Sequence, residues 1–139
     1  MIQLLDDQLL GQVLRGADPP RPGAEVYTTG YWYVRLCQAV LGATERAGVL
    51  SAPFASLPDA ARARAIAGLL ALPPTIGLVS LRDLGPRIGQ LRARHHLNVL
   101  SMEALAAASQ LEADVFLSAP APRLLEALAT EGRTATVVT

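Results

Sequence analysis

The sequence lacks lysine altogether and contains only one cysteine. All 12 basic residues of the 139 are arginine, so any mechanism that depends on a lysine amine is excluded. The single Cys37 cannot form an intrachain disulfide or a cysteine zinc site, and its apolar neighbours at helical spacing indicate core packing. Disulfide scaffolds, cysteine metal centres and lysine chemistry are therefore all excluded.

The sequence also lacks net charge and long hydrophobic runs. Its 12 acidic residues balance the 12 basic ones, which leaves no global electrostatic attraction to a nucleic-acid polyanion. No stretch reaches the roughly 18 apolar residues of a membrane span, and the N-terminus has no secretory signal pattern. We therefore expect a cytoplasmic protein without membrane contact. Its hydrophobic content of 51% predicts a single globular domain over residues 1–139.

Short apolar runs are the main structural signal in the chain. The run Ile2–Leu5, followed by Asp6 and Asp7, is typical of a strand buried on both faces of a parallel sheet. Further strands are expected at 24–28, 76–81, 114–118 and 135–138. Helices are expected at 9–16, 31–50, 59–72, 84–96, 101–111 and 120–131, with loops at 17–23 and 51–58.

This alternation predicts an α/β fold with three α/β/α layers and a mainly parallel sheet of four to five strands. Ligands of such sheets bind at the carboxyl ends of the strands, near the point where the strand order reverses. Asp6 and Asp7 stand at that end of the first strand. Two acids beside a dry sheet require a neutralising group, such as a metal ion, a basic side chain or helix amides.

Two stretches resemble the PIN domain, a small metal-dependent ribonuclease fold. They are the opening LLDDQLLGQVLRG and the later IGLVSLRDLGPRIGQLRARHHLNVLSMEALAAASQLEADVFLSAP. The resemblance extends over nearly the whole chain in the order of its elements. It implies RNA as a substrate, Mg²⁺ or Mn²⁺ as the cofactor, an antitoxin protein as a partner, and a homodimer.

The resemblance also implies an acidic site. Asp6, in LLDDQLL, matches the first acid of the family, and Glu103, in SMEALAAA, matches the acid that opens a later helix. These two are the implied catalytic residues and metal ligands. Asp7, which is not at a position of the family pattern, is the third expected metal ligand, because it or a water could complete the shell of the ion. Two further acids of the family pattern are replaced, one near Tyr33 and one near Pro120.

The missing acids divide the functional prediction in two, because a hard divalent ion needs several oxygen ligands. The favoured hypothesis is a PIN-like protein with a degenerate nuclease site, weak or absent ribonuclease activity, and a role in binding protein or RNA. The alternative is an active Mg²⁺- or Mn²⁺-dependent endoribonuclease of the toxin type that uses Asp6 and Glu103. Asp7 and Asp114 are the nearby acids that could compensate for the missing ones.

Each candidate residue also has a structural interpretation. Asp6 could cap the helix that follows it, and an acid in a first helical turn, as at Glu103, is favoured by the helix dipole. Tyr33 either fills the place of a lost carboxylate or packs in the core. Four arginines have two possible interpretations, as a basic face that binds RNA or as a solvated helix surface. They are Arg82, Arg87, Arg92 and Arg94. A response-regulator receiver domain, which also has paired acids after its first strand, is excluded because it requires a lysine.

Overall fold

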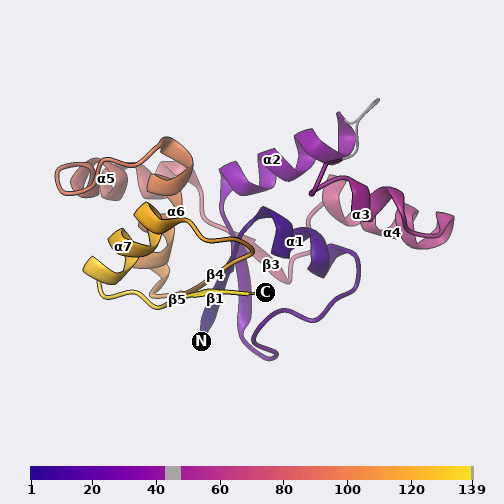
Figure 1. Ribbon diagram of the computed structural model, residues 1–139, viewed down its shortest axis with the longest axis horizontal. Helices are drawn as coiled ribbons and strands as arrows, with labels where there is room; N and C mark the ends of the chain where they lie inside the picture. The colour runs from indigo at the N-terminus through magenta and orange to yellow at the C-terminus, as the bar shows by residue number, and fades with distance from the viewer. Residues whose placement is uncertain (43–47, 139) are drawn as a thin grey trace.

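The computed structural model describes residues 1–42 and 48–138, and a parallel sheet forms its centre (Figure 1). The five strands of the sheet lie in the order β3-β2-β1-β4-β5. They are β1 (Ile2–Leu5), β2 (Glu25–Thr28), β3 (Ile76–Leu78), β4 (Asp114–Leu117) and β5 (Ala135–Val137). All four strand pairings are parallel, which confirms the predicted α/β class and its mainly parallel sheet.

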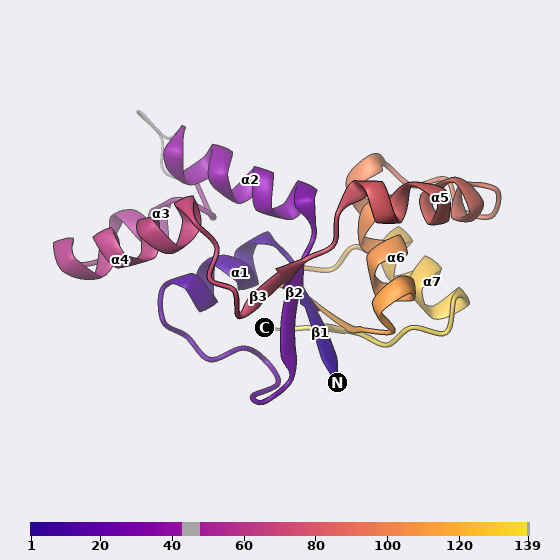
Figure 2. The same cartoon turned by 180° about the vertical axis from the view of Figure 1, so that it is seen from behind.

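The helices of the described residues lie on the two faces of this sheet, which completes the three predicted layers (Figures 1 and 2). Four helices lie on one face: α1 (Asp7–Leu14), α2 (Gly30–Leu41), α3 (Ala52–Ala55) and α4 (Asp59–Leu70). Three helices lie on the other: α5 (Leu81–Arg92), α6 (Val99–Leu111) and α7 (Pro122–Thr130). None of these helices has the length and apolar character needed to cross a membrane.

The first strand is buried on both faces, as its sequence predicts. Leu4 packs in the core beneath α5, α6 and α7, whereas Leu5 packs with Leu9 and Phe116 beneath α1. Both leucines are fully buried. Each such burial stabilises the fold by about 2 kcal/mol, so the strand anchors both helical layers at once.

The order of the strands reverses between β1 and β4. From β1 the chain adds β2 and then β3 on one side, and it returns through α5 and α6 to place β4 on the other side of β1. Leu5, at the end of β1, is in register with Phe116 of β4. Asp6 and the loop that follows β4 therefore lie at the topological switch point, where parallel sheets of this kind bind ligands.

The helix predicted over 31–50 and the loop predicted after it differ from the structure. The helix predicted over 31–50 ends at Leu41, and its Val34 and Leu41 side chains are exposed, although the sequence pattern placed them on the apolar side. Residues 43–47 of that prediction lie outside the described residues. The predicted loop 51–58 contains the short helix α3, which brings Phe54 into the core.

Local capping bonds explain two other shifts. The Ser80 hydroxyl accepts a hydrogen bond from the Arg82 amide, and α5 therefore begins at Leu81, three residues earlier than predicted. The N-cap of α6 is Asn98 and not Ser101. The Asn98 Oδ1 atom accepts from the Ser101 amide at 2.8 Å, so the residue predicted as the cap lies within the first turn.

Candidate functional site

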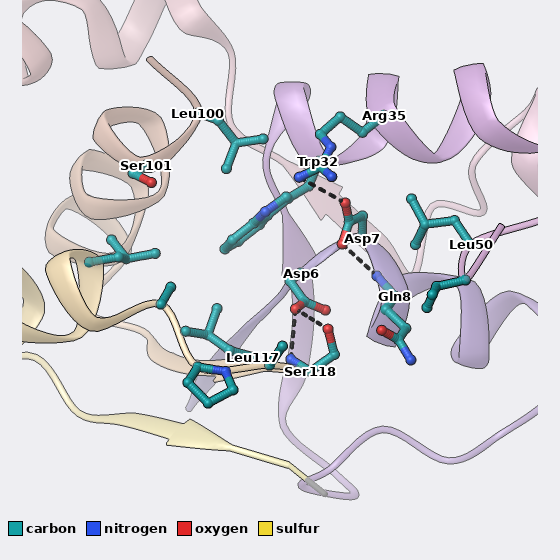
Figure 3. Close-up of a pocket in the computed structure, with 15 residues that line it drawn as sticks. Asp6, Asp7, Gln8, Trp32, Arg35, Leu50, Leu100, Ser101, Leu117 and Ser118 are labelled. Atoms are coloured by element: carbon teal, nitrogen blue, oxygen red, sulfur yellow. Dashed lines mark hydrogen bonds and ion pairs between the residues drawn. The ribbon is translucent and has the colours of Figure 1, made fainter. Parts of the chain in front are cut away.

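A cavity of about 310 Å³ opens at the switch point of the sheet (Figure 3). It lies among the start of α1, the first turns of α2 and α6, and the loop between β4 and α7. Its polar and aromatic lining comprises Asp6, Asp7, Gln8, Trp32, Arg35, Ser101 and Ser118. Two of the three predicted metal ligands, Asp6 and Asp7, therefore line one cavity, whereas Glu103 is not among its lining residues.

Asp6 is held by three hydrogen bonds from the protein itself. Its Oδ1 atom accepts from the Leu9 amide at 3.0 Å, which makes Asp6 the N-cap of α1. Its Oδ2 atom accepts from both the amide and the hydroxyl of Ser118, at 2.7 and 2.6 Å (Figure 3). Asp6 therefore joins the carboxyl end of β1 to that of β4, and the capping interpretation of this residue is confirmed.

Glu103 is completely buried on α6 and caps a different helix. Its two carboxylate oxygens accept from the amides of Gly30 and Tyr31, at 3.1 and 2.8 Å, in the first turn of α2. The Thr29 hydroxyl accepts from the next amide, that of Trp32. Because α2 has no acid in its own first turn, Glu103 supplies the negative charge that the positive end of its dipole favours.

Asp7 is the least satisfied of the three carboxylates. Its Oδ1 atom accepts from the Gln8 amide at 2.8 Å, but its buried Oδ2 atom accepts no hydrogen bond from the described residues. The nearest cation is Arg35 of α2, whose Nη1 atom lies 3.5 Å from Oδ2 (Figure 3). Burial raises the pKa of Asp7 and the neighbouring Asp6 charge raises it further, whereas Arg35 and the Gln8 amide act in the opposite direction.

The three predicted ligands do not form a set that fits a divalent ion. Five of their six carboxylate oxygens accept hydrogen bonds from the protein, and the sixth faces Arg35. Mg²⁺ and Mn²⁺ need several oxygen ligands directed at one point. In residues 1–42 and 48–138, no group of three or more His, Cys, Asp or Glu side chains is arranged to hold a metal.

The two residues expected at the missing acid positions lie in different environments. Pro120 does line the cavity, as its place after β4 predicts. The Tyr33 hydroxyl instead donates to the Leu69 carbonyl at the end of α4, at 2.6 Å, and the ring packs in the core there. Trp32 and Arg35 are the α2 residues that line the cavity, whereas Tyr33 packs on another side of the helix.

Asp114 is at the opposite edge of the sheet from the cavity. It is the first residue of β4, and its carboxylate accepts from Arg21 at 2.9 Å. Arg21 also lies over the Phe116 ring, and its backbone is held by the buried Gln3 side chain. The expectation that Asp114 compensates for a missing acid at the site is therefore wrong, because the strand itself separates the two edges.

The arginines considered as an RNA-binding face do not share one side of α5. Arg82, Arg87 and Arg92 are exposed, but successive members are five residues apart, which turns each one well away from the last. Arg94 lies beyond the helix, where it and His95 both bind Glu131 of the loop after α7. A solvated surface explains these residues better than a continuous basic face.

Sequence reasoning missed Arg35 and Ser118. Ser118 stands in FLSAP, two residues before Pro120 at the end of the fourth predicted strand, so its hydroxyl could have been identified as a partner of Asp6. Arg35 in YWYVRL had no such signal, because its contact with Asp7 depends on how α2 packs against α1.

The fold and site define a three-layer α/β protein with an acidic cavity neutralised by its own arginine and amides. No protein-family model matches the sequence, and no curated protein matches it either.

Proposed function

We propose that this chain is a PIN-like domain that works as a binding module and does not cleave RNA. The observation that carries the proposal is the use of the expected catalytic acids as helix caps. Asp6 caps α1 and Glu103 caps α2, each with both carboxylate oxygens engaged. A metal ion would have to displace these amides, and each displacement would leave a helix terminus without its acceptor.

The electrostatics of the cavity support the same proposal. A nuclease site of this type needs cations to activate water and to offset charge on the leaving oxygen. Here Arg35 already offsets the charge of Asp7, and Ser118 and the Leu9 amide satisfy Asp6. These contacts stabilise the acids without providing an open coordination position.

The proposed partner of this module is a second copy of the chain. Tyr31, Val34 and Leu41 are spaced at i, i+3 and i+10 on α2, and 39%, 47% and 50% of each residue is exposed. This spacing forms one apolar stripe, which is the pattern of a helix that contacts another surface. We expect a dimeric mass by light scattering, and a monomer when Val34 is changed to Glu. Persistence of the dimer in Val34→Glu would overturn this assignment of the surface.

The activity test compares wild type with Asp6→Ala on structured and unstructured RNA in Mn²⁺. We expect no cleavage that differs between the two proteins and no Mn²⁺ binding by calorimetry. Thermal unfolding of both proteins checks that each is folded at the assay temperature. Cleavage by wild type that disappears in Asp6→Ala would overturn the proposal.

The competing function is an Mg²⁺- or Mn²⁺-dependent toxin-type endoribonuclease that uses Asp6 and Glu103, with an antitoxin protein as its partner. One observation favours it, since Asp6 and Asp7 lie in a cavity at the switch point of the sheet. It requires the Glu103 side chain to leave the α2 amides and turn toward Asp6. RNA cleavage lost in both Asp6→Ala and Glu103→Gln would establish this function.

A further inference from the structure

The contact between Asp7 and Arg35 is the one ionic interaction across the mouth of the cavity that the described residues provide. Asp7 begins α1 and Arg35 lies one turn into α2, so the pair joins two helices that pack against each other. Figure 3 shows the guanidinium reaching over the carboxylate from the α2 side. The pair therefore stands where an ion approaching Asp7 from the cavity would arrive.

The buried carboxylate of Asp7 requires a positive charge beside it. The residue is only 7% exposed, its Oδ2 atom accepts no hydrogen bond from the described residues, and the Asp6 carboxylate is its neighbour in sequence. A buried carboxylate without a partner is costly, and a second carboxylate beside it increases that cost. Arg35 is the group that meets this requirement.

Arg35 is nevertheless loosely held. Its Nη1 atom lies 3.5 Å from Asp7 Oδ2, which is wider than a charge-assisted hydrogen bond, and 56% of its side chain is exposed. Among the described residues, the guanidinium of Arg35 makes no other hydrogen bond or ion pair. The side chain can therefore be removed without opening the core.

We propose that Arg35 is a resident counterion that keeps divalent cations away from Asp7, so that the acidic edge is a cation site closed by the chain itself. This inference rests on the proposed function, since it gives a physical reason for the absence of metal binding that the proposed function expects. A guanidinium is a monovalent charge that cannot be lost near neutral pH. It excludes other cations both by its charge and by the space it occupies.

Removal of this charge leaves Asp6 and Asp7 side by side with no basic partner. Asp7 Oδ2 then becomes free to ligate an ion, and water can complete the coordination shell. Only weak binding is expected, because Asp6 remains engaged by Leu9 and Ser118. The expected dissociation constant is on the order of 0.1 to 1 mM.

The test measures Mn²⁺ binding by calorimetry and by electron paramagnetic resonance, with no RNA present. Arg35→Met keeps the apolar stem and removes the charge, whereas Arg35→Lys keeps the charge. We expect Arg35→Met to bind Mn²⁺ at least about tenfold more tightly than wild type and Arg35→Lys to resemble wild type. Adding Asp7→Asn to Arg35→Met should abolish the gained binding.

The matched control is Arg94→Met. Arg94 also pairs with a carboxylate, that of Glu131, and 57% of its side chain is exposed. An equal gain in Arg94→Met would overturn the proposal, because the effect would then follow from net charge alone. No gain in folded Arg35→Met would also overturn it while leaving the proposed function intact. Tight Mn²⁺ binding by wild type would instead overturn the proposed function itself.

Discussion

Two arginine–carboxylate pairs in this protein have arginines of nearly equal exposure, but the pKa values of their carboxylates are shifted in opposite directions. Arg35 and Arg94 are 56% and 57% exposed, and they pair with Asp7 and Glu131 respectively. The pKa of Asp7 is raised, mainly by burial, whereas the pKa of Glu131 is lowered by hydrogen bonds from Arg94 and His95. The number of donors around a carboxylate and its burial therefore decide the sign of the shift, and the exposure of the arginine does not.

The same comparison extends to the buried caps. Asp6 and Glu103 are buried like Asp7, but every one of their oxygens accepts a hydrogen bond. Glu131 is satisfied near the surface by two basic side chains. Three environments thus occur among four acids: buried and satisfied, buried and partly satisfied, and near the surface and satisfied.

The largest expected effect comes from Glu103→Ala. The change removes the acceptors of the Gly30 and Tyr31 amides and leaves a cavity at the fully buried Glu103 position, between α6 and α2. We expect a loss of about 3 kcal/mol in the free energy of unfolding, measured by urea denaturation. Glu126→Ala, at an exposed position of α7, is the control and should change little. A loss below about 1 kcal/mol in Glu103→Ala would mean that α2 finds other acceptors.

A smaller effect is expected for Asp6→Ala, because Ser118 lies at the cavity wall and α1 can be capped in part by water. The loss of the N-cap and of the tie to β4 should cost about 2 kcal/mol of unfolding free energy. Ser118→Ala removes the hydroxyl bond and keeps the amide bond, so it should cost about half as much. Equal losses in the two variants would show that the cap contributes nothing.

The smallest effect, and the sharpest test of the comparison, is the dependence of stability on pH. Because the pKa of Asp7 is raised, its carboxyl group binds a proton more tightly in the folded state than in the unfolded state. The contribution of Asp7 to the free energy of unfolding therefore falls as the pH rises from 3.8 through the pKa of the folded state. The lowered pKa of Glu131 means the reverse: its contribution is present above 4.5 and is lost as pH falls through the folded pKa.

Asp7→Asn and Glu131→Gln should therefore change the pH profile of unfolding in opposite directions. Asp7→Asn should gain stability relative to wild type as pH rises above 3.8. Glu131→Gln should lose stability relative to wild type above 4.5, by less than about 1 kcal/mol and less again in high salt. Urea unfolding at several pH values measures the difference in unfolding free energy between each variant and wild type. If that difference changed with pH in the same direction for both variants, the two carboxylates would not be shifted in opposite directions.

The sequence was sufficient for the layers of the fold and for one part of the site. The apolar run at Leu4 and Leu5 predicted burial on both faces of a parallel sheet, and the structure confirms it. The position of Asp6 at the end of that strand followed from the same run. The helix predicted over 31–50 was wrong at its end, because the prediction ran beyond Leu41, the last of the apolar residues that supported it. The helix ends at Leu41, and the Gly42 amide donates the capping bond to the Gln38 carbonyl.

The sequence was insufficient wherever a side chain acts on another element. The sequence placed Glu103 in the first turn of its own helix, because Ser101 was expected to be the N-cap, and that placement is wrong. The helix α6 begins at Val99 and has no acid in its first turn. Glu103 instead caps α2, and it is 73 residues away along the chain from Gly30. The PIN resemblance and the functional hypotheses drawn from it stay predictions. Their residues can be tested one by one because the partners of each carboxylate are now defined.

The amino-acid order alone determined the order of the strands and of the longer helices along the chain, since apolar spacing, prolines and glycines act over a few neighbouring residues. The tertiary structure alone decided what each acid touches, because those contacts depend on how α1, α2 and α6 meet above the switch point. Arg35 reaches Asp7, and Glu103 reaches α2, only after the sheet has brought these helices together. The preference for helix or strand depends on residues within one segment, whereas the charge balance of the cavity depends on contacts between side chains and amides of different segments.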